Sequence, residues 1–513
     1  MSKGKVYLVG AGPGDPKLIT VRGLEALKKS DAVVFDRLAG PQLLGEISPA
    51  AERIYVGKRP DRHTMKQEEI NQLLVDLALQ GKTVCRLKGG DPTVFGRVGE
   101  EAELLKKNGV PYEIVPGITS AISVPAYAGI PVTHRDLASS FSVITGHESP
   151  DKLDRSIQWD KVTNATGTLV FLMGVSKIGY ISDQLMKHGR PPSTPVALVR
   201  WGTRAEQDTL VGTLADIEAK VLEADFQPPA VIVVGEVVNQ RDALRWVEDK
   251  PLFGRRILVT RARSQASELS ARIDELGGEP YEYPVIETRM TDAPAAVGAI
   301  RNALAEPESY DWVMLTSVNG VDFFFRWLEE FGVDIRRLHK AEFAAVGPAT
   351  AAVLKARGIL ASQLPETFQA EGLMDSLASR LQPGQRALLP RGDLARRWLP
   401  EELRKLGVEA VELDVYETIA AAPQDRMLME MLLEGGIHAV TFTSSSTVTN
   451  LLEALRKMGA ERPQDLLHGV DIVCIGPITA KTAGENGLRV TATAQNATIE
   501  GLIQTLLDIQ SQA

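Results

Sequence analysis

The second half of this sequence contains an internal repeat, and this repeat constrains the fold more than any other feature. Four short segments recur later in the chain, each displaced by nearly the same distance along the sequence. The matched segments are 257–261 with 387–391, 285–288 with 415–418, 312–317 with 439–444, and 345–351 with 474–480. Strand–turn patterns recur in any α/β protein, which is the alternative explanation, but a nearly constant displacement favours duplication. We therefore expect two similar α/β lobes that face each other across a cleft.

The first half alternates short apolar runs with amphipathic segments. This pattern is typical of α/β proteins, whose parallel strands are buried on both faces. We expect a helix over 18–29 and strands over 6–9, 32–35, 83–87, 142–144, 168–173, 196–200 and 230–234. A polar stretch with Pro251 and Gly254 then separates this half from a new strand that starts at Arg256.

The length of 513 residues suits three or four domains. We place the first unit at 1–248, with subdomains of about 1–133 and 134–248. The second unit is placed at 252–513, with lobe one formed by about 252–288 plus 419–513 and lobe two by about 289–418. The linker between the units is short, so we expect the two units to lie close together.

Composition and charge exclude several classes of protein. The net charge of −9 argues against a general nucleic-acid binder. Cys85 and Cys474 are too few for a disulfide framework or a zinc cluster, and His63, His134 and His147 lack metal-ligand spacing. The sequence has no signal-peptide core and no apolar stretch long enough to cross a membrane. We expect a cytoplasmic protein without a metal and without a nucleic-acid or membrane partner.

The first predicted strand runs into a glycine-rich turn with Gly10, Gly12 and Gly14. The spacing is Gly-x-Gly-x-Gly, whereas a dinucleotide-binding turn has Gly-x-Gly-x-x-Gly. Pro13 and Pro16 also delay the start of a helix that could hold a pyrophosphate. A Rossmann dinucleotide site is therefore disfavoured.

The segment 86–101 is the densest motif in the chain. Gly89 and Gly90 follow a strand, where the absence of side chains lets the backbone approach a ligand closely. Asp91 adds a carboxylate at the same place. Arg97 and Glu100 are three residues apart and can share one face at the start of a helix.

Residues 4–247 resemble the uroporphyrinogen-III C-methyltransferases. The matching segments are 10–16, 36–38, 57–59, His63, 86–101, 115–120, 128–135 and 229–238. The resemblance implies a two-domain tetrapyrrole methylase fold that transfers methyl groups from S-adenosyl-L-methionine to C2 and C7 of uroporphyrinogen III. The products would be precorrin-2 and S-adenosyl-L-homocysteine. The residues that it assigns to the cofactor pocket are Pro13, Gly89, Gly90, Asp91, Val94, Thr119, Ser120, Met173, Gly202 and Ala230.

The same resemblance implies how a substrate with eight carboxylates is held by a protein that is itself acidic. Arg37, Arg97 and Arg135 stand at the family's substrate positions, and guanidinium–carboxylate pairs suit that task. Glu100 is the candidate general base; the alternative is an ordinary surface ion pair between Arg97 and Glu100. Val98 departs from the glycine that is common in the family. The family's methyltransferases are usually dimers, so we expect a homodimer formed through this unit.

Residues 252–513 resemble uroporphyrinogen-III synthase, whose fold has two α/β lobes joined by two strands. The matching segments are 254–261, 315–321, 346–351, 413–418, 443–446, 475–480 and 497–502. The resemblance implies cyclisation of hydroxymethylbilane with inversion of ring D. Binding shape should dominate this reaction. We expect the substrate's carboxylates to meet hydroxyl and backbone N–H groups of Thr316, Ser317, Gly347, Thr443, Ser444 and Gly476.

Tyr416 matches the family's tyrosine and is a candidate proton donor to the departing hydroxyl. Its counterpart in the first repeat is Ile286, so Tyr416 breaks the repeat's symmetry. The alternative is a buried strand tyrosine with a satisfied hydroxyl. A serine hydrolase built on 443–446 is disfavoured because the segment lacks a Gly-x-Ser-x-Gly turn.

The combined interpretation is a bifunctional enzyme, α/β throughout, whose second unit makes the substrate of the first. Two alternatives stay open. The first unit could have another tetrapyrrole methylase activity, or the chain could be a regulatory binding protein with a synthase-like module. The later use of precorrin-2, in cobalamin, sirohaem or another tetrapyrrole, also stays open.

Overall fold

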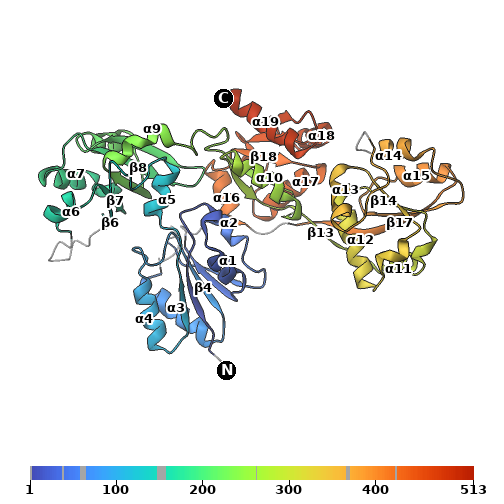
Figure 1. Cartoon of the computed structure of the whole chain (residues 1–513), viewed down its shortest axis with the longest axis horizontal. Coiled ribbons are helices and arrows are strands. Elements are labelled where there is room, and N and C mark those ends of the chain that lie inside the picture. Colours follow the sequence, from blue (N-terminus) through green and yellow to red (C-terminus); the bar gives the residue numbers. More distant parts are fainter. Residues whose placement is uncertain are drawn as a thin grey trace.

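The computed structural model describes residues 3–36, 40–57, 65–146, 157–261, 263–365, 370–421 and 425–512. These residues form four five-stranded sheets, each flanked by helices, which confirms the predicted α/β class (Figure 1). None of the described helices combines the length and apolar character that a membrane crossing needs.

The first sheet is entirely parallel and has the order β3-β2-β4-β1-β5. Its strands are β1 (Val6–Gly10), β2 (Ala32–Phe35), β3 (Glu52–Tyr55), β4 (Val84–Lys88) and β5 (Tyr112–Val115), and its helices are α1 (Val21–Lys28), α2 (Pro41–Leu44), α3 (Gln67–Leu79) and α4 (Val98–Lys107). The three strands predicted here are confirmed. Edge strands β3 and β5 are each exposed at two of their four positions and contain charged residues, so they lack the apolar runs by which the others were found.

The predicted helix 18–29 begins later than expected. Pro16 opens a short 3-10 turn, Pro16–Leu18, and α1 starts only at Val21. The side chain of Thr20 caps α1 by accepting a hydrogen bond from the Gly23 backbone N–H. The prolines therefore separate the glycine-rich turn from the helix, as the sequence indicated.

The second sheet is mixed and has the order β6-β7-β10-β8-β9. Its strands are β6 (Phe141–Thr145), β7 (Thr168–Leu172), β8 (Pro195–Arg200), β9 (Asp208–Thr213) and β10 (Ala230–Val234), and its helices are α5 (Ser120–Tyr127), α6 (Trp159–Ala165), α7 (Ile178–Lys187), α8 (Ile217–Glu223) and α9 (Arg241–Leu244). Helix α5 leads from the first sheet into the second and packs on β7 and β10.

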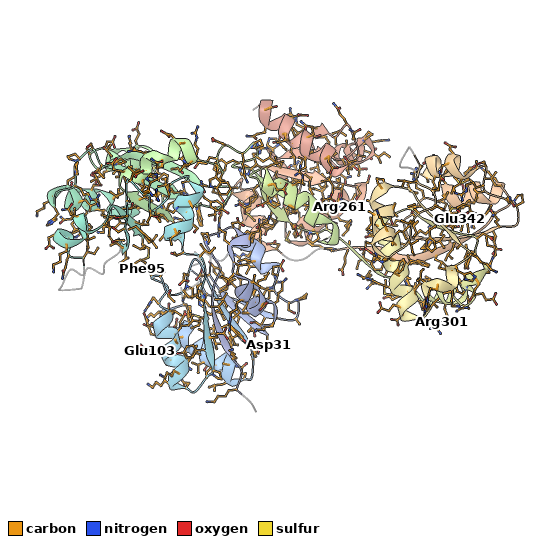
Figure 2. The ribbon with its side chains drawn as sticks, in the orientation of Figure 1. Asp31, Phe95, Glu103, Arg261, Arg301 and Glu342 are labelled. Carbon is orange, nitrogen blue, oxygen red and sulfur yellow. The ribbon has the colours of Figure 1, made fainter. Side chains whose placement is uncertain are left out.

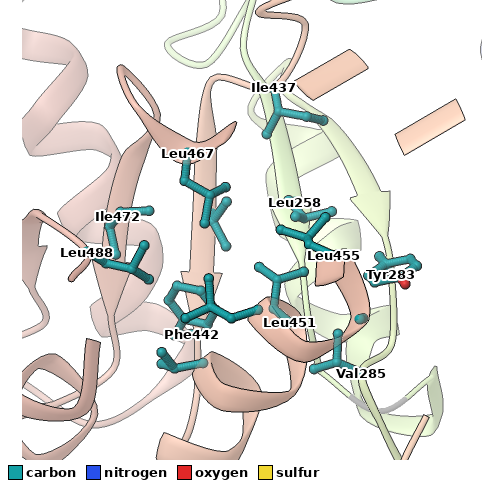
Figure 3. Packing of buried hydrophobic residues seen from close by; sticks show 14 of the residues in the cluster. Leu258, Tyr283, Val285, Ile437, Phe442, Leu451, Leu455, Leu467, Ile472 and Leu488 are labelled. Atoms are coloured by element: carbon teal, nitrogen blue, oxygen red, sulfur yellow. The ribbon is translucent and has the colours of Figure 1, made fainter. Parts of the chain in front are cut away.

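Lobe one of the second half is a parallel sheet of order β12-β11-β18-β19-β20. Its strands are β11 (Arg256–Val259), β12 (Glu279–Glu282), β18 (Ala439–Phe442), β19 (Asp471–Cys474) and β20 (Val490–Thr493), and its helices are α10 (Arg263–Glu275), α16 (Arg426–Leu433), α17 (Ser445–Lys457), α18 (Pro477–Glu485) and α19 (Ile499–Gln512). Leu258, Phe442 and Leu451 pack together in one of its cores (Figure 3).

Lobe two has the order β13-β17-β16-β14-β15, with only β13 antiparallel to its neighbour. Its strands are β13 (Ile286–Met290), β14 (Trp312–Leu315), β15 (Glu342–Ala345), β16 (Arg386–Gly392) and β17 (Glu409–Ala420), and its helices are α11 (Pro294–Ala303), α12 (Val318–Glu330), α13 (Pro348–Ala356), α14 (Ala370–Leu377) and α15 (Trp398–Lys405). The lobe boundaries expected near 288 and 418 fall inside β13 and β17, whose residues pair with each other.

The internal repeat is present in the structure, but one repeat unit does not correspond to one lobe. Strands β11 and β12 are repeated as β16 and β17, and strands β14 and β15 are repeated as β18 and β19. The spatial orders β12-β11-β18-β19 and β17-β16-β14-β15 are equivalent. Each lobe therefore takes one strand pair from each repeat unit. Lobe one lies between the first unit and lobe two (Figure 1).

Candidate functional site

Three loops meet at the carboxyl edge of the first sheet, where adjacent strands β4, β1 and β5 end. Gly12 and Gly90 exchange backbone hydrogen bonds, with N···O distances of 3.2 and 2.7 Å. A Cβ placed on Gly10 would lie 2.6 Å from the Gly117 backbone, and one placed on Gly117 would lie 2.4 Å from the Gly90 carbonyl oxygen. Only glycines allow the three loops to approach this closely.

Asp91 ties two of these loops together. Its Oδ2 accepts a hydrogen bond from the Gly117 N–H at 2.9 Å, and its Oδ1 accepts one from the Thr93 N–H at 2.7 Å. The Val94 N–H donates to the Asp91 carbonyl at 3.2 Å. Asp91 and Val94 therefore belong to one turn, and both carboxylate oxygens of Asp91 accept hydrogen bonds from backbone N–H groups.

The other predicted cofactor residues lie at one edge of the second sheet. Met173 follows β7, Gly202 follows β8, and Ala230 opens β10, and these three strands are neighbours. A Cβ on Gly202 would lie 2.5 Å from the Val124 side chain of α5, the helix that begins at Ser120. The two groups of predicted cofactor residues therefore meet at the junction of the two sheets.

Backbone strain is concentrated at this junction. Met173, Trp201 and Thr203 have φ angles of 58°, 45° and 74°, in the left-handed region that non-glycine residues rarely adopt. For the β-branched Thr203 this conformation is especially unfavourable. Such residues persist where surrounding contacts hold them, and they cluster at ligand sites.

Arg97 and Glu100 form the ion pair that their spacing predicted. Arg97 is the residue before α4, and its Nε and Nη2 donate to the Glu100 carboxylate at 2.7 and 2.6 Å. The side chains are 51% and 48% exposed. The hydrogen bond from Arg97 lowers the pKa of Glu100 below its ordinary value of 4.5. In this state Glu100 is ionised and engaged, so its role as a base stays a prediction.

A buried charged cluster behind this pair was not predicted. Glu101 is 0% exposed, and its Oε1 accepts a hydrogen bond from Lys88 Nζ at 2.6 Å. Arg86 lies 3.4 Å from the same oxygen and 3.2 Å from Asp36, which directly follows β2. Burial lowers the pKa of Lys88. The sequence did contain one signal for this cluster. Arg86 and Lys88 stand at alternate positions of β4, so their side chains share one face of the strand.

The structure describes only some of the remaining predicted residues of the first unit. Arg135 is exposed in the loop between α5 and β6. His134 Nδ1 accepts a hydrogen bond from the Asp136 N–H at 3.2 Å. Arg37, His63 and His147 lie outside the described residues. Within the described part of the chain, no group of three His, Cys, Asp or Glu residues is arranged to hold a metal.

In the second half, four helix N-termini follow four strands in a repeated arrangement. Ser317 and Gly347 precede α12 and α13, which follow the adjacent strands β14 and β15. Ser444 and Gly476 precede α17 and α18, which follow the adjacent strands β18 and β19. Each lobe therefore presents two neighbouring helix N-termini, whose N–H groups and dipoles favour anions. Thr316 and Thr443 directly precede the two capping serines.

Tyr416 lies in β17, one of the strands that lead from one lobe to the other. Its hydroxyl is 3.4 Å from Ser317 Oγ, and either atom can donate. Its ring stacks on Phe323 of α12, with ring centroids 5.2 Å apart. The structure therefore places the predicted proton donor beside a predicted substrate-binding helix end.

Figure 2 labels Arg261, which follows β11, on the side of lobe one toward lobe two.

Comparison with known proteins gives matches for both halves. The family model described as tetrapyrrole (corrin/porphyrin) methylases matches residues 5–218, and that of uroporphyrinogen-III synthase HemD matches residues 267–504. The porphyrin biosynthesis protein HemD of Ruminiclostridium josui is 39% identical over 509 residues, which are 99% of this chain and 99% of that protein.

Two further proteins match the first half alone. The S-adenosyl-L-methionine-dependent uroporphyrinogen III methyltransferase of Methanosarcina barkeri is 52% identical over 241 residues, which are 47% of this chain and 94% of that protein. A solved structure, the uroporphyrin-III C-methyl transferase of Thermus thermophilus complexed with S-adenyl homocysteine, is 39% identical. That match covers 46% of this chain and 99% of the other, with a TM-score of 0.39.

Proposed function

The chain belongs to the family of bifunctional tetrapyrrole-biosynthesis enzymes that join a uroporphyrinogen-III C-methyltransferase to a uroporphyrinogen-III synthase, and from this premise we propose the reactions of its two units. The C-terminal unit cyclises hydroxymethylbilane to uroporphyrinogen III with inversion of ring D. The N-terminal unit methylates C2 and C7 of that product with S-adenosyl-L-methionine, which gives precorrin-2. One unit therefore supplies the substrate of the other.

The observation that carries the methyl-transfer proposal is the glycine-lined junction of the two sheets. A Cβ on Gly90 would find its nearest neighbours 3.8 and 3.9 Å away, at Ser120 and Thr119, whereas those on Gly10 and Gly117 would collide with backbone. The space beside Gly90 thus suits a ligand held by backbone groups. S-adenosyl-L-methionine, when bound there, supplies a methyl group on a positively charged sulfur that an electron-rich pyrrole carbon can attack.

The chain's own contribution to methyl transfer is orientation and proton removal. Arg97 is half-exposed, so a substrate carboxylate can reach its guanidinium group and compete with Glu100. Glu100, once released from the ion pair, can accept the proton that the methylated carbon skeleton must lose. Arg37 and Arg135 are proposed to hold further carboxylates of the same substrate.

For the synthase unit, we propose that the four helix N-termini hold the carboxylates of hydroxymethylbilane. Tyr416 then donates its hydroxyl proton to the departing hydroxyl, which leaves as water. The repeated arrangement of these helix ends supports this, because it offers anion sites on both lobes to a long substrate.

We also propose a cytoplasmic homodimer formed through the methyltransferase unit. This part of the proposal rests on the resemblance of residues 4–247 to a family whose methyltransferases are usually dimers.

The direct test is to supply hydroxymethylbilane with and without S-adenosyl-L-methionine and to identify the tetrapyrrole by mass and absorbance. Without the methyl donor we expect the type-III isomer of uroporphyrinogen, and with the donor we expect a product that carries two more methyl groups. Uroporphyrinogen III supplied directly should give the same methylated product. Formation of only the type-I isomer would refute the synthase assignment. An unmethylated product in the presence of S-adenosyl-L-methionine would refute the methyltransferase assignment.

A Tyr416→Phe substitution tests the proposed proton donor. It keeps the ring stacked on Phe323 but removes the hydroxyl, so we expect type-III isomer formation to slow by about 10²-fold, a typical contribution of general acid catalysis. The rate is followed by chromatographic separation of the isomers. Tyr180→Phe, in the methyltransferase unit, is the matched control. An undiminished rate in Tyr416→Phe would exclude an essential role of the hydroxyl.

A further inference from the structure

The loop of residues 201–207, which contains the proposed cofactor residue Gly202, is anchored on the methyltransferase side by the glycine-rich turn. The Asp15 N–H donates to Thr203 Oγ1 at 3.0 Å. A Cβ on Gly14 would lie 2.8 Å from the Arg204 side chain, so the loop packs directly against that turn. Because Trp201 and Thr203 have positive φ angles, the loop is strained and depends on such contacts.

The same loop is anchored from the other side by the synthase unit. The Ala205 N–H donates to Glu279 Oε2 at 2.8 Å, and Arg256 Nη2 lies 2.6 Å from Glu206 Oε2. Arg256 also pairs with Glu279 at 2.9 Å and is only 2% exposed. Burial by itself would raise the pKa of Glu206, but the hydrogen bond from Arg256 and the positive charges of Arg256 and Arg204 together outweigh burial, so the pKa is lowered. Arg256 and Glu279 of lobe one therefore join the loop to the synthase unit, and the ion pair of Lys17 with Asp274 is a further contact between the two units.

Lobe two contains the same ion pair without the contact to the methyltransferase. Arg386 and Glu409 occupy the positions of the internal repeat that are equivalent to Arg256 and Glu279, and they pair at 3.0 Å. Their side chains are 33% and 58% exposed. The pair is thus a feature of the lobe architecture, and only in lobe one is it covered by the loop. The architecture of a lobe explains why the ion pair forms, but it does not explain why the pair in lobe one is covered by the loop 201–207.

We infer that Arg256 and Glu279 of the synthase unit are positioning residues for the cofactor pocket of the methyltransferase unit, through the loop 201–207. The inference rests on the proposed function, since it takes Gly202 to line the S-adenosyl-L-methionine pocket. The Methanosarcina barkeri relative, which matches only the first half, shows that a methyltransferase of this family exists without an attached synthase. In this chain, the contacts couple cofactor affinity to the synthase unit.

The test measures binding of S-adenosyl-L-homocysteine to the full-length protein by calorimetry. Glu206→Gln and Arg256→Met should each weaken binding by about 5-fold or more, a typical size for coupling between sites. They should raise the KM for S-adenosyl-L-methionine, with uroporphyrinogen III supplied directly, more than they lower kcat. Arg386→Met and Glu409→Gln, at the equivalent exposed pair, are the matched controls and should leave binding unchanged.

Hydrogen exchange distinguishes a positioning role of these residues from a merely structural one. Because coupling is reciprocal, S-adenosyl-L-homocysteine should slow exchange at the Ala205 amide and in β12 of the wild-type protein, and Glu206→Gln should remove the effect in β12. Unchanged affinity in Glu206→Gln, or no protection of β12, would overturn the inference. If Arg256→Met fails to fold, Glu206→Gln decides, since Glu206 belongs to the methyltransferase unit. A wild-type protein that binds no S-adenosyl-L-homocysteine would instead refute the proposed function.

Discussion

Replacing Gly117 by alanine is expected to lower methyl transfer by at least about 10²-fold, because a misplacement of about 1 Å in a catalytic site has effects of that size. The new Cβ would lie 2.4 Å from the Gly90 carbonyl oxygen and 2.7 Å from Gly10 Cα. Backbone atoms cannot rotate away as a side chain can, so the loops must separate. The rate is measured with uroporphyrinogen III and S-adenosyl-L-methionine, and binding of S-adenosyl-L-homocysteine should fall with it.

The synthase rate of the Gly117→Ala variant should stay at the wild-type value, since Gly117 belongs to the other unit. Gly298→Ala is a suitable control, because no atom lies within 4 Å of a Cβ at that position in α11. It should keep both activities and add about 0.5–1 kcal/mol of stability, as glycine is unfavourable inside a helix. Full methyl transfer by Gly117→Ala would show that the three loops need not touch.

Replacing Glu100 by glutamine is expected to leave S-adenosyl-L-homocysteine binding intact and to lower methyl-transfer turnover by about 10²–10⁴-fold, the usual contribution of a general base. Arg97 lowers the pKa of Glu100, so the carboxylate stays ionised well below neutral pH in the free protein. Any stability from the pair is therefore present above the ordinary pKa of 4.5 and is lost only as the pH falls through the lowered value. We expect no titration of Glu100 in the free enzyme near neutral pH.

Glu103→Gln is the matched control for Glu100→Gln, because Glu103 is exposed on the same helix, α4 (Figure 2). The structure also offers a competing assignment. Asp36 follows β2 at the same edge of the first sheet and pairs with Arg86. Wild-type turnover in Glu100→Gln together with its loss in Asp36→Asn would move the role of base from Glu100 to Asp36.

Local patterns in the sequence predicted the central strands, the glycine-rich loops and the Arg97–Glu100 pair. These features depend on neighbouring residues: a continuous apolar run forms a buried strand, and a spacing of three at a helix start brings Arg97, the residue before α4, to Glu100 in the first turn. Edge strands β3 and β5 were missed for the same reason, since their exposed positions carry no such pattern.

The sequence by itself determined the family, the order of the two units and the presence of a repeat, because each follows from motifs in chain order. Only the tertiary structure decided how Glu101 is buried against Lys88 and how Arg256 reaches Glu206. The physical reason is that a buried charge needs an opposite charge from a distant part of the chain. Spacing along one sequence does not record which distant residue supplies it.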